Sequence, residues 1–181
     1  MNTNSLKKTV SFNYSSYLKS LILLMKPRVM SLVIFTCAVG LLISPINVNL
    51  FDAMISIFFV ALGAGAAGTL NMWYEADLDK LMTRTCLRPI PTGKIEKKDA
   101  LIFGILLSLF SVIGLYYFSN FISAALLLLT IAFYVFVYTI WLKRKTPQNI
   151  VIGGASGALP PVIGWTIATN SLTFEPITLF L

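Results

Sequence analysis

The residues best suited to chemistry lie in a polar stretch from Asn71 to Lys94, between two long apolar segments. Asn71, Glu75 and Asp79 recur every four residues, so on a helix their oxygen-bearing side chains form one stripe about 12 Å long. Carboxylates at this spacing repel each other unless a positive charge lies between them. Mg²⁺ prefers carboxylate and amide oxygens, and it usually combines few protein ligands with a phosphate-bearing substrate. The stripe therefore predicts a site for Mg²⁺ and a phosphorylated ligand, with Asp77 as a neighbouring carboxylate.

Basic residues follow the acidic stripe directly. Lys80, Arg84 and Arg88 also recur every four residues, which on a helix would place them in a second stripe. An acidic stripe, a metal, a diphosphate and a basic stripe form the simplest chemistry that uses all these residues. The charges alone are equally consistent with a solvated turn between two membrane helices.

The composition is that of a membrane protein. Of 181 residues, 57% are hydrophobic and only 12% are charged, whereas a soluble domain carries roughly a quarter charged residues. The sequence contains no histidine, which excludes a histidine metal ligand or general base from this chain. The net charge of +7 would suggest nucleic acid in a soluble protein, but here the positive-inside rule accounts for it, and we expect no nucleic-acid partner.

The apolar segments predict an all-α membrane protein with about five transmembrane helices and the start of a sixth. Residues 1–20 form a polar N-terminal tail, and residues 21–181 form one transmembrane domain. The predicted spans are 21–43, 53–73, 100–118, 121–142 and 149–168, followed by an apolar segment at 172–181. Asp99 is the expected cap of the third span.

All 14 basic residues fall into three regions, which lie before the core of the first span, after the second span and after the fourth. If the spans alternate in direction, these regions share one side of the membrane, which the positive-inside rule predicts to be the cytoplasm, together with the N-terminus. We therefore expect the acidic stripe and the cluster Lys143–Lys145 to meet at the mouth of one cavity.

A charged site at the end of an apolar cavity suits an isoprenoid diphosphate. Its hydrocarbon tail partitions into lipid, and its head carries about three negative charges that require Mg²⁺ and Arg or Lys. Ionisation of the allylic C–O bond leaves a carbocation and a diphosphate. The protein must then stabilise the leaving group and exclude water.

Several motifs resemble a known family. Asn71-x3-Glu75-x3-Asp79 is similar to the first aspartate-rich motif of UbiA-type intramembrane prenyltransferases, with Glu75 replacing the usual aspartate. Three further runs resemble the haem O synthase branch of that family, the protoheme IX farnesyltransferases. They are KPRV at 26–29, DLDKLMTRTCLRP at 77–89, and the long block from Tyr138 to Trp165.

The resemblance implies a bundle of nine transmembrane helices in the bacterial inner (plasma) membrane. It also implies transfer of a farnesyl group from farnesyl diphosphate to a vinyl group of haem B, giving haem O. Carried over by position, Asn71, Glu75 and Asp79 are the catalytic and metal-binding residues, with Asp77 supporting the metal. The residues expected to neutralise the diphosphate are Arg84, Arg88, Lys143 and Arg144.

The family has a second aspartate-rich motif after its sixth helix, and this sequence stops before that point. We therefore expect the N-terminal portion of such an enzyme, which binds Mg²⁺ and diphosphate weakly alone or works with a separate polypeptide that carries the remaining helices. Three alternatives remain: a prenyltransferase of a quinone pathway, a non-catalytic membrane remnant, and a channel or transporter. The last is disfavoured because no charged residue lies deep in spans two to five.

Overall fold

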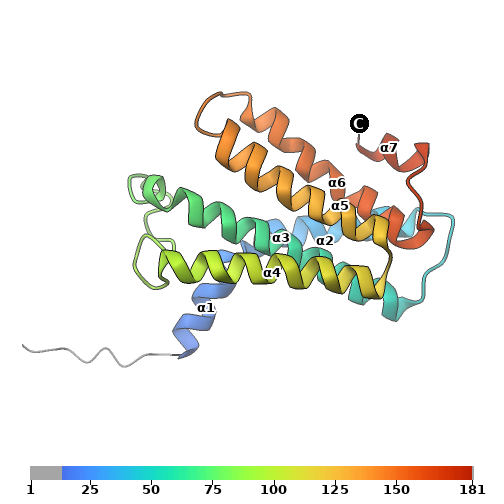
Figure 1. Ribbon diagram of the computed structural model, residues 1–181, viewed down its shortest axis with the longest axis horizontal. Helices are drawn as coiled ribbons and strands as arrows, with labels where there is room; N and C mark the ends of the chain where they lie inside the picture. The colour runs from blue at the N-terminus through green and yellow to red at the C-terminus, as the bar shows by residue number, and fades with distance from the viewer. Residues whose placement is uncertain (1–13, 181) are drawn as a thin grey trace, which may run out of the picture.

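The computed structural model describes residues 14–180, and most of this part of the chain is helical (Figure 1). Residues 1–13, which include most of the predicted tail, and residue 181 lie outside the described residues. Four helices are long and apolar enough to span a membrane, and a bent pair at the N-terminal end adds a fifth. The predicted all-α membrane fold is therefore confirmed. The elements are α1 (Tyr14–Leu24), α2 (Pro27–Leu42), α3 (Leu50–Asp79), α4 (Lys97–Phe118), α5 (Phe121–Ala132), η1 (Phe133–Leu142), α6 (Asn149–Thr169) and α7 (Phe174–Phe180).

The first predicted span is divided into two helices. α1 begins at Tyr14, within the segment expected as a tail, and α1 and α2 meet at an angle of 51°. The break lies at Lys26, whose backbone is left-handed with φ 54°. Pro27 explains the break, because it disfavours the right-handed helical conformation of the preceding residue and suits the first position of a new helix. The predicted span over 21–43 is therefore present as a bent pair of helices rather than as one straight helix.

α3 is the central element and contacts α1, α2, α4, α5, η1 and α6. It has 30 residues, and at 1.5 Å per residue it is about 45 Å long, well beyond the ~30 Å hydrocarbon core of a bilayer. The helix continues beyond the predicted span, which ends near residue 73, and carries Glu75 and Asp79 on its last two turns. The charged end of α3 thus projects past the length that lipid requires.

The predicted basic stripe after α3 does not form. The helix ends at Asp79, and residues 80–96 fold into turns that bring Arg88 back to Asp79. Lys80, Arg84 and Arg88 therefore do not share one helical face. Asp99 is not the cap of α4 either, because Glu96 holds that position and Asp99 lies in the first turn. A carboxylate there still interacts favourably with the helix dipole.

The remaining spans match their predicted limits closely. α5 and its π-helical continuation η1 together cover 121–142, and α6 covers 149–169. α6 packs against α2 at very short range, because a Cβ atom at Gly40 would lie 2.0 Å from the Pro161 carbonyl oxygen and one at Gly164 would lie 2.0 Å from that of Cys37. These glycines let the two backbones approach closely.

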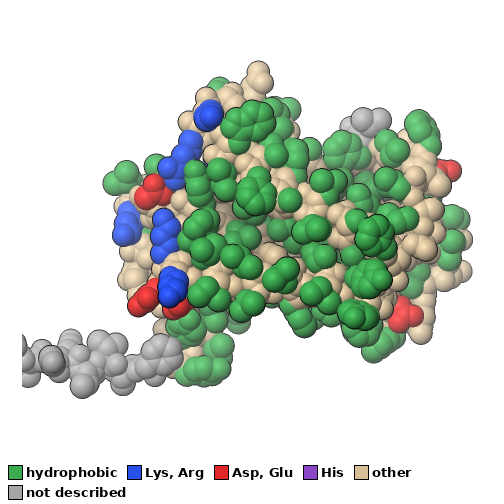
Figure 2. Space-filling model, in the orientation of Figure 1, with side chains coloured by type: hydrophobic (Ala, Val, Ile, Leu, Met, Phe, Trp, Pro, Cys, Tyr) green, Lys and Arg blue, Asp and Glu red, His purple; other side chains and the backbone are tan. Residues whose placement is uncertain are grey.

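Lys and Arg side chains gather at one end of the helices, whereas the sides of the bundle are mostly hydrophobic (Figure 2). The end of α3, the loop 80–96 and the loop after η1 all lie at this end (Figure 1). The chain is therefore an integral membrane protein with one strongly basic end.

Candidate active site

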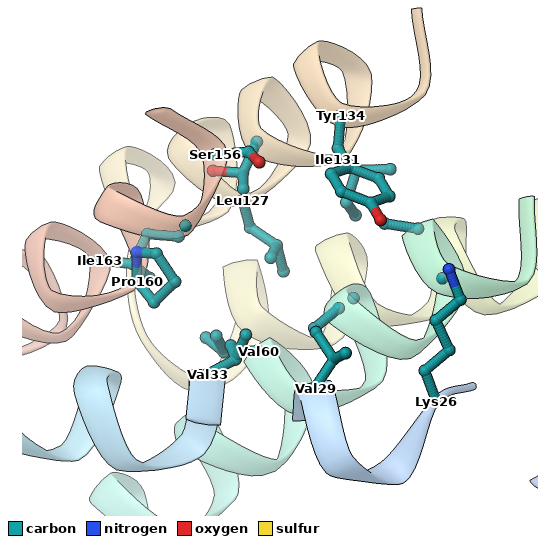
Figure 3. Close-up of a pocket in the computed structure, with 16 residues that line it drawn as sticks. Lys26, Val29, Val33, Val60, Leu127, Ile131, Tyr134, Ser156, Pro160 and Ile163 are labelled. Atoms are coloured by element: carbon teal, nitrogen blue, oxygen red, sulfur yellow. The ribbon is translucent and has the colours of Figure 1, made fainter. Parts of the chain in front are cut away.

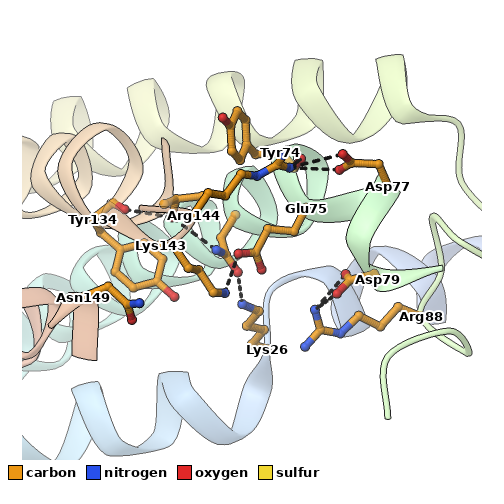
Figure 4. Close-up of polar contacts among 12 residues, drawn as sticks. Lys26, Tyr74, Glu75, Asp77, Asp79, Arg88, Tyr134, Lys143, Arg144 and Asn149 are labelled. Atoms are coloured by element: carbon orange, nitrogen blue, oxygen red, sulfur yellow. Dashed lines mark hydrogen bonds and ion pairs between the residues drawn. The ribbon is translucent and has the colours of Figure 1, made fainter. Parts of the chain in front are cut away.

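The polar end of α3 carries three buried oxygen-bearing side chains. Asn71, Glu75 and Asp79 are 1%, 5% and 3% exposed, and each contacts a basic side chain from another part of the chain (Figure 4). A buried charge is costly unless it is paired, so the folded state depends on these contacts. The helical stripe predicted from the spacing is confirmed.

Asn71 joins three elements. Its Oδ1 accepts a hydrogen bond from the Nζ of Lys26 at the α1–α2 break, and its Nδ2 donates to Thr139 Oγ1 in η1 at 3.1 Å. Thr139 Oγ1 in turn donates to the Tyr134 carbonyl oxygen, five residues earlier, at 2.9 Å. The two polar atoms of the amide are thus held from opposite sides, which directs the oxygen towards Lys26.

Glu75 forms an ion pair with Lys143, the first residue after η1. The Lys143 amide donates to the Tyr138 carbonyl oxygen at 3.0 Å, which continues the π-helical pattern, and the Lys143 ammonium lies 5.4 Å from the centre of the Tyr138 ring. The π-helical turns therefore carry Lys143 to the face of η1 that also presents Thr139 to α3. π-helical turns are rare and often occur at functional sites.

Asp79 closes the opposite side of the site. Both of its carboxylate oxygens accept from Arg88 Nη1, at 2.9 and 2.7 Å, and its backbone carbonyl oxygen accepts from Thr85 Oγ1 at 3.2 Å. Arg88 is about a quarter exposed. The loop after α3 is thereby tied to the last residue of that helix.

Asp77 and Arg144 form a separate pair at the rim. Arg144 Nη2 lies 3.0 Å from Asp77 Oδ1, and the guanidinium stacks 4.7 Å from the centre of the Tyr74 ring. Because both charged side chains are more than a third exposed, solvent screens the pair and it contributes little to stability.

The structure brings most of the predicted site residues together. Asn71, Glu75, Asp79 and Lys143 form one cluster with Arg88, and the expected meeting of the α3 end with the loop 143–145 is observed. Arg84 is exposed and takes part in none of the three ion pairs found within residues 14–180.

Lys26 and Thr139 were not among the predicted site residues. Two signals could have indicated Lys26: it is a cation next to Pro27 in a largely apolar segment, where a charge requires a partner, and it begins the KPRV run that resembles the family. No sequence feature indicated Thr139, because its role depends on the π-helical register of η1.

A cavity of about 120 Å³ lies beside this cluster, lined by α2, α3, α5, η1 and α6 (Figure 3). Its walls are almost wholly apolar, with Val29, Val60, Leu127 and Ile163 among the lining side chains. Lys26 both lines the cavity and bonds Asn71, so the apolar space and the buried oxygens share a boundary. The arrangement suits a ligand with an apolar tail and an anionic head.

The oxygens of α3 are chemically suited to Mg²⁺. In the described part of the chain, no three His, Cys, Asp or Glu residues are gathered as a ready-made metal site. However, Mg²⁺ commonly takes only one or two carboxylates and completes its coordination with waters and substrate phosphates. Glu75, Asp79 and the Asn71 amide provide such a set on one helical face, and each now contacts a cationic side chain.

A helical membrane protein with buried acidic and amide oxygens beside an apolar cavity is the kind of protein that handles an amphipathic anion. Comparison with known sequences makes the assignment specific. The UbiA prenyltransferase family matches residues 32–181, and the chain belongs to this family.

Individual relatives agree with this assignment. The chain is 71% identical over 181 residues to the protoheme IX farnesyltransferase of Pelagibacter ubique (strain HTCC1062), covering all of this chain and 58% of that protein. It is 60% identical over 159 residues to the protein of the same name from Rhodopseudomonas palustris (strain BisB18), covering 88% of this chain and 51% of that one. The chain thus spans little more than half the length of these relatives.

Among solved structures, a UbiA homolog from Archaeoglobus fulgidus bound to GPP and Mg²⁺ has a TM-score of 0.65 and 20% sequence identity, covering 91% of this chain and 58% of that one. At this identity the likeness concerns the fold. It supports the predicted UbiA-type bundle independently of the sequence motifs.

Proposed function

We propose that this chain provides the prenyl-diphosphate half of a protoheme IX farnesyltransferase. The observation that carries the proposal is that Lys26 lines an apolar cavity and donates to Asn71, the first of three buried oxygen-bearing residues on α3 that continue with Glu75 and Asp79. The names of the most similar relatives supply the reaction, which is farnesyl transfer from farnesyl diphosphate to haem B.

Asn71, Glu75 and Asp79 would hold Mg²⁺, with Asp77 supporting it from the rim. Bound there, Mg²⁺ would neutralise charge on the diphosphate and assist its departure. Binding of the metal and diphosphate would release Lys26, Lys143 and Arg88 from their present partners, and these cations would then contact the phosphate oxygens. Arg144 and Arg84 lie further out and would act through longer-range attraction.

The cavity would hold the part of the farnesyl chain nearest the head group. An apolar cavity of about 150 Å³ accommodates one benzene ring, so a space of 120 Å³ is too small for all fifteen carbons. The far end of the chain would extend towards lipid. Tyr134, which lines the cavity near Lys26, would present its ring to the developing allylic cation.

In the transfer, the C–O bond of farnesyl diphosphate breaks and diphosphate leaves. A vinyl carbon of haem B forms the new bond to the farnesyl C1, which leaves a cation on the haem side chain. Water adds to this cation and loses a proton, so that a hydroxyl group remains on the product. The relatives' names favour haem over the aromatic acceptors of quinone pathways. The distribution of basic residues favours a cytoplasmic position for the site, in a bacterial inner membrane.

The relatives are longer than this chain, so a complete enzyme would need further helices, from the same or a separate polypeptide. The test is a chimera in which this chain is joined to the part of the Pelagibacter ubique protein that it does not span. Membranes containing the chimera should convert haem B and farnesyl diphosphate to a farnesylated, hydroxylated haem detected by mass spectrometry. Asp79→Asn should reduce this conversion more than 100-fold.

Lys145→Ala is the matched control, because Lys145 is exposed and belongs to none of the three described ion pairs. A membrane-inserted chimera that makes no product would refute the proposed reaction. Undiminished product with Asp79→Asn would refute the assigned site.

A further inference from the structure

The loop from Asp79 to Arg88, here called the 79–88 loop, is closed on itself. The Asp79–Arg88 ion pair joins its two ends, and Thr85 Oγ1 donates to the Asp79 carbonyl oxygen across its middle. Thr85 is only 3% exposed. The loop is therefore fixed on the inside, and most of its other side chains are exposed.

The displayed side chains include large apolar groups. Leu81 and Leu87 are 83% and 81% exposed, more than any other large hydrophobic residue in the described chain, and Met82 is half exposed. They follow the charged end of α3, whose 30 residues exceed the ~30 Å hydrocarbon core by about 15 Å. Exposed apolar groups gathered at one place commonly mark a binding surface.

Two exposed cations belong to the same loop. Lys80 and Arg84 are exposed, and neither belongs to the ion pairs formed by residues 14–180. Apolar side chains interspersed with free cations match a ligand that is broad, apolar and edged with carboxylates. Haem B is such a ligand, with a flat macrocycle and two propionates.

We infer that the 79–88 loop is the docking surface for the haem acceptor, with Leu81 and Leu87 against the macrocycle and Arg84 paired to a propionate. This inference rests on the proposed function. Because Asp79 is both the anchor of the loop and a predicted metal ligand, the acceptor is held beside the diphosphate head. Holding two reactants side by side in this way is a major source of rate enhancement.

The experiment is a titration of the chain in lipid nanodiscs with haem B, followed by the Soret absorbance. Arg84→Gln and the double variant Leu81→Gln/Leu87→Gln should each raise the dissociation constant about tenfold. Arg28→Gln and Leu42→Gln are matched controls, since both side chains are exposed and lie outside the loop, and they should bind as the native chain does.

Haem B dimethyl ester isolates the charge contact, because it lacks free carboxylates. The native chain should bind the ester about as weakly as Arg84→Gln binds haem B, and Arg84→Gln should weaken ester binding no further. Native-like haem binding by both loop variants would overturn the inference and would favour contact of the leucines with lipid head groups. A parallel titration with a non-hydrolysable farnesyl diphosphate analogue tests the proposed function separately from the haem inference. If the native chain did not bind the analogue, the proposed function would be refuted, whereas the haem result would stand.

Discussion

Replacement of Thr139 by valine tests whether the orientation of Asn71 matters. Thr139 is fully buried, and its hydroxyl group is the acceptor for Asn71 Nδ2. Valine keeps the shape but leaves a buried amide donor without this partner, at a cost of about 1–3 kcal/mol. Such a loss corresponds to roughly a 5- to 150-fold change in an equilibrium constant. We expect the apparent dissociation constant for the divalent cation to rise within that range.

The assay is titration of Mn²⁺, a spectroscopic substitute for Mg²⁺, into the chain with the farnesyl diphosphate analogue, followed by electron paramagnetic resonance. Thr139→Ser retains the hydroxyl group and should restore most of the affinity. Thr69→Val is the control, since Thr69 is equally buried but donates only to the Gly65 carbonyl oxygen of its own helix. If Thr139→Val and Thr69→Val bound the cation alike, the idea that Thr139 positions Asn71 would be refuted.

Two further predictions concern packing and charge. Gly164→Ala should clearly lower the thermal unfolding temperature in detergent, because the added methyl group would meet the backbone of α2. Gly154→Ala is the control: it lies in the same helix, a Cβ there would have nothing within 4 Å, and the unfolding temperature should change little. Equal shifts for the two variants would contradict close α2–α6 packing. Lys143→Ala should weaken binding of the farnesyl diphosphate analogue at least tenfold, as measured by calorimetry, because it removes a cation from the buried cluster. Lys145→Ala should leave that affinity unchanged, and a comparable loss would indicate general electrostatic attraction rather than a specific contact.

Most of the architecture was predictable because hydropathy and basic-residue distribution determine how a chain crosses a membrane. The spans over 121–142 and 149–168 were located within a residue or so for this reason. The break at Lys26 was harder to predict, because it combines a proline effect with a tertiary bond to Asn71. The fold of the 79–88 loop depends on the long-range capture of Arg88 by Asp79, which helical spacing does not reveal.

The site was predictable to the extent that it lies on one regular helix. Asn71, Glu75 and Asp79 follow from a period of four residues, and the charges of Glu75 and Asp79 required nearby cations. Which cations pair with these carboxylates was only partly predictable. Lys143 was expected from the membrane topology, whereas Arg84, which the sequence places as favourably as Arg88, lies outside the cluster because the helix stops at Asp79.

The central claim is that Asn71, Glu75 and Asp79 hold a metal-bound diphosphate at the mouth of the apolar cavity. Calorimetric titration of the chain in nanodiscs with the farnesyl diphosphate analogue, with and without Mg²⁺, tests it most directly. We predict binding that requires Mg²⁺ and that falls at least tenfold in the double variant Glu75→Gln/Asp79→Asn. Equal affinity without the cation, or in the double variant, would contradict the claim.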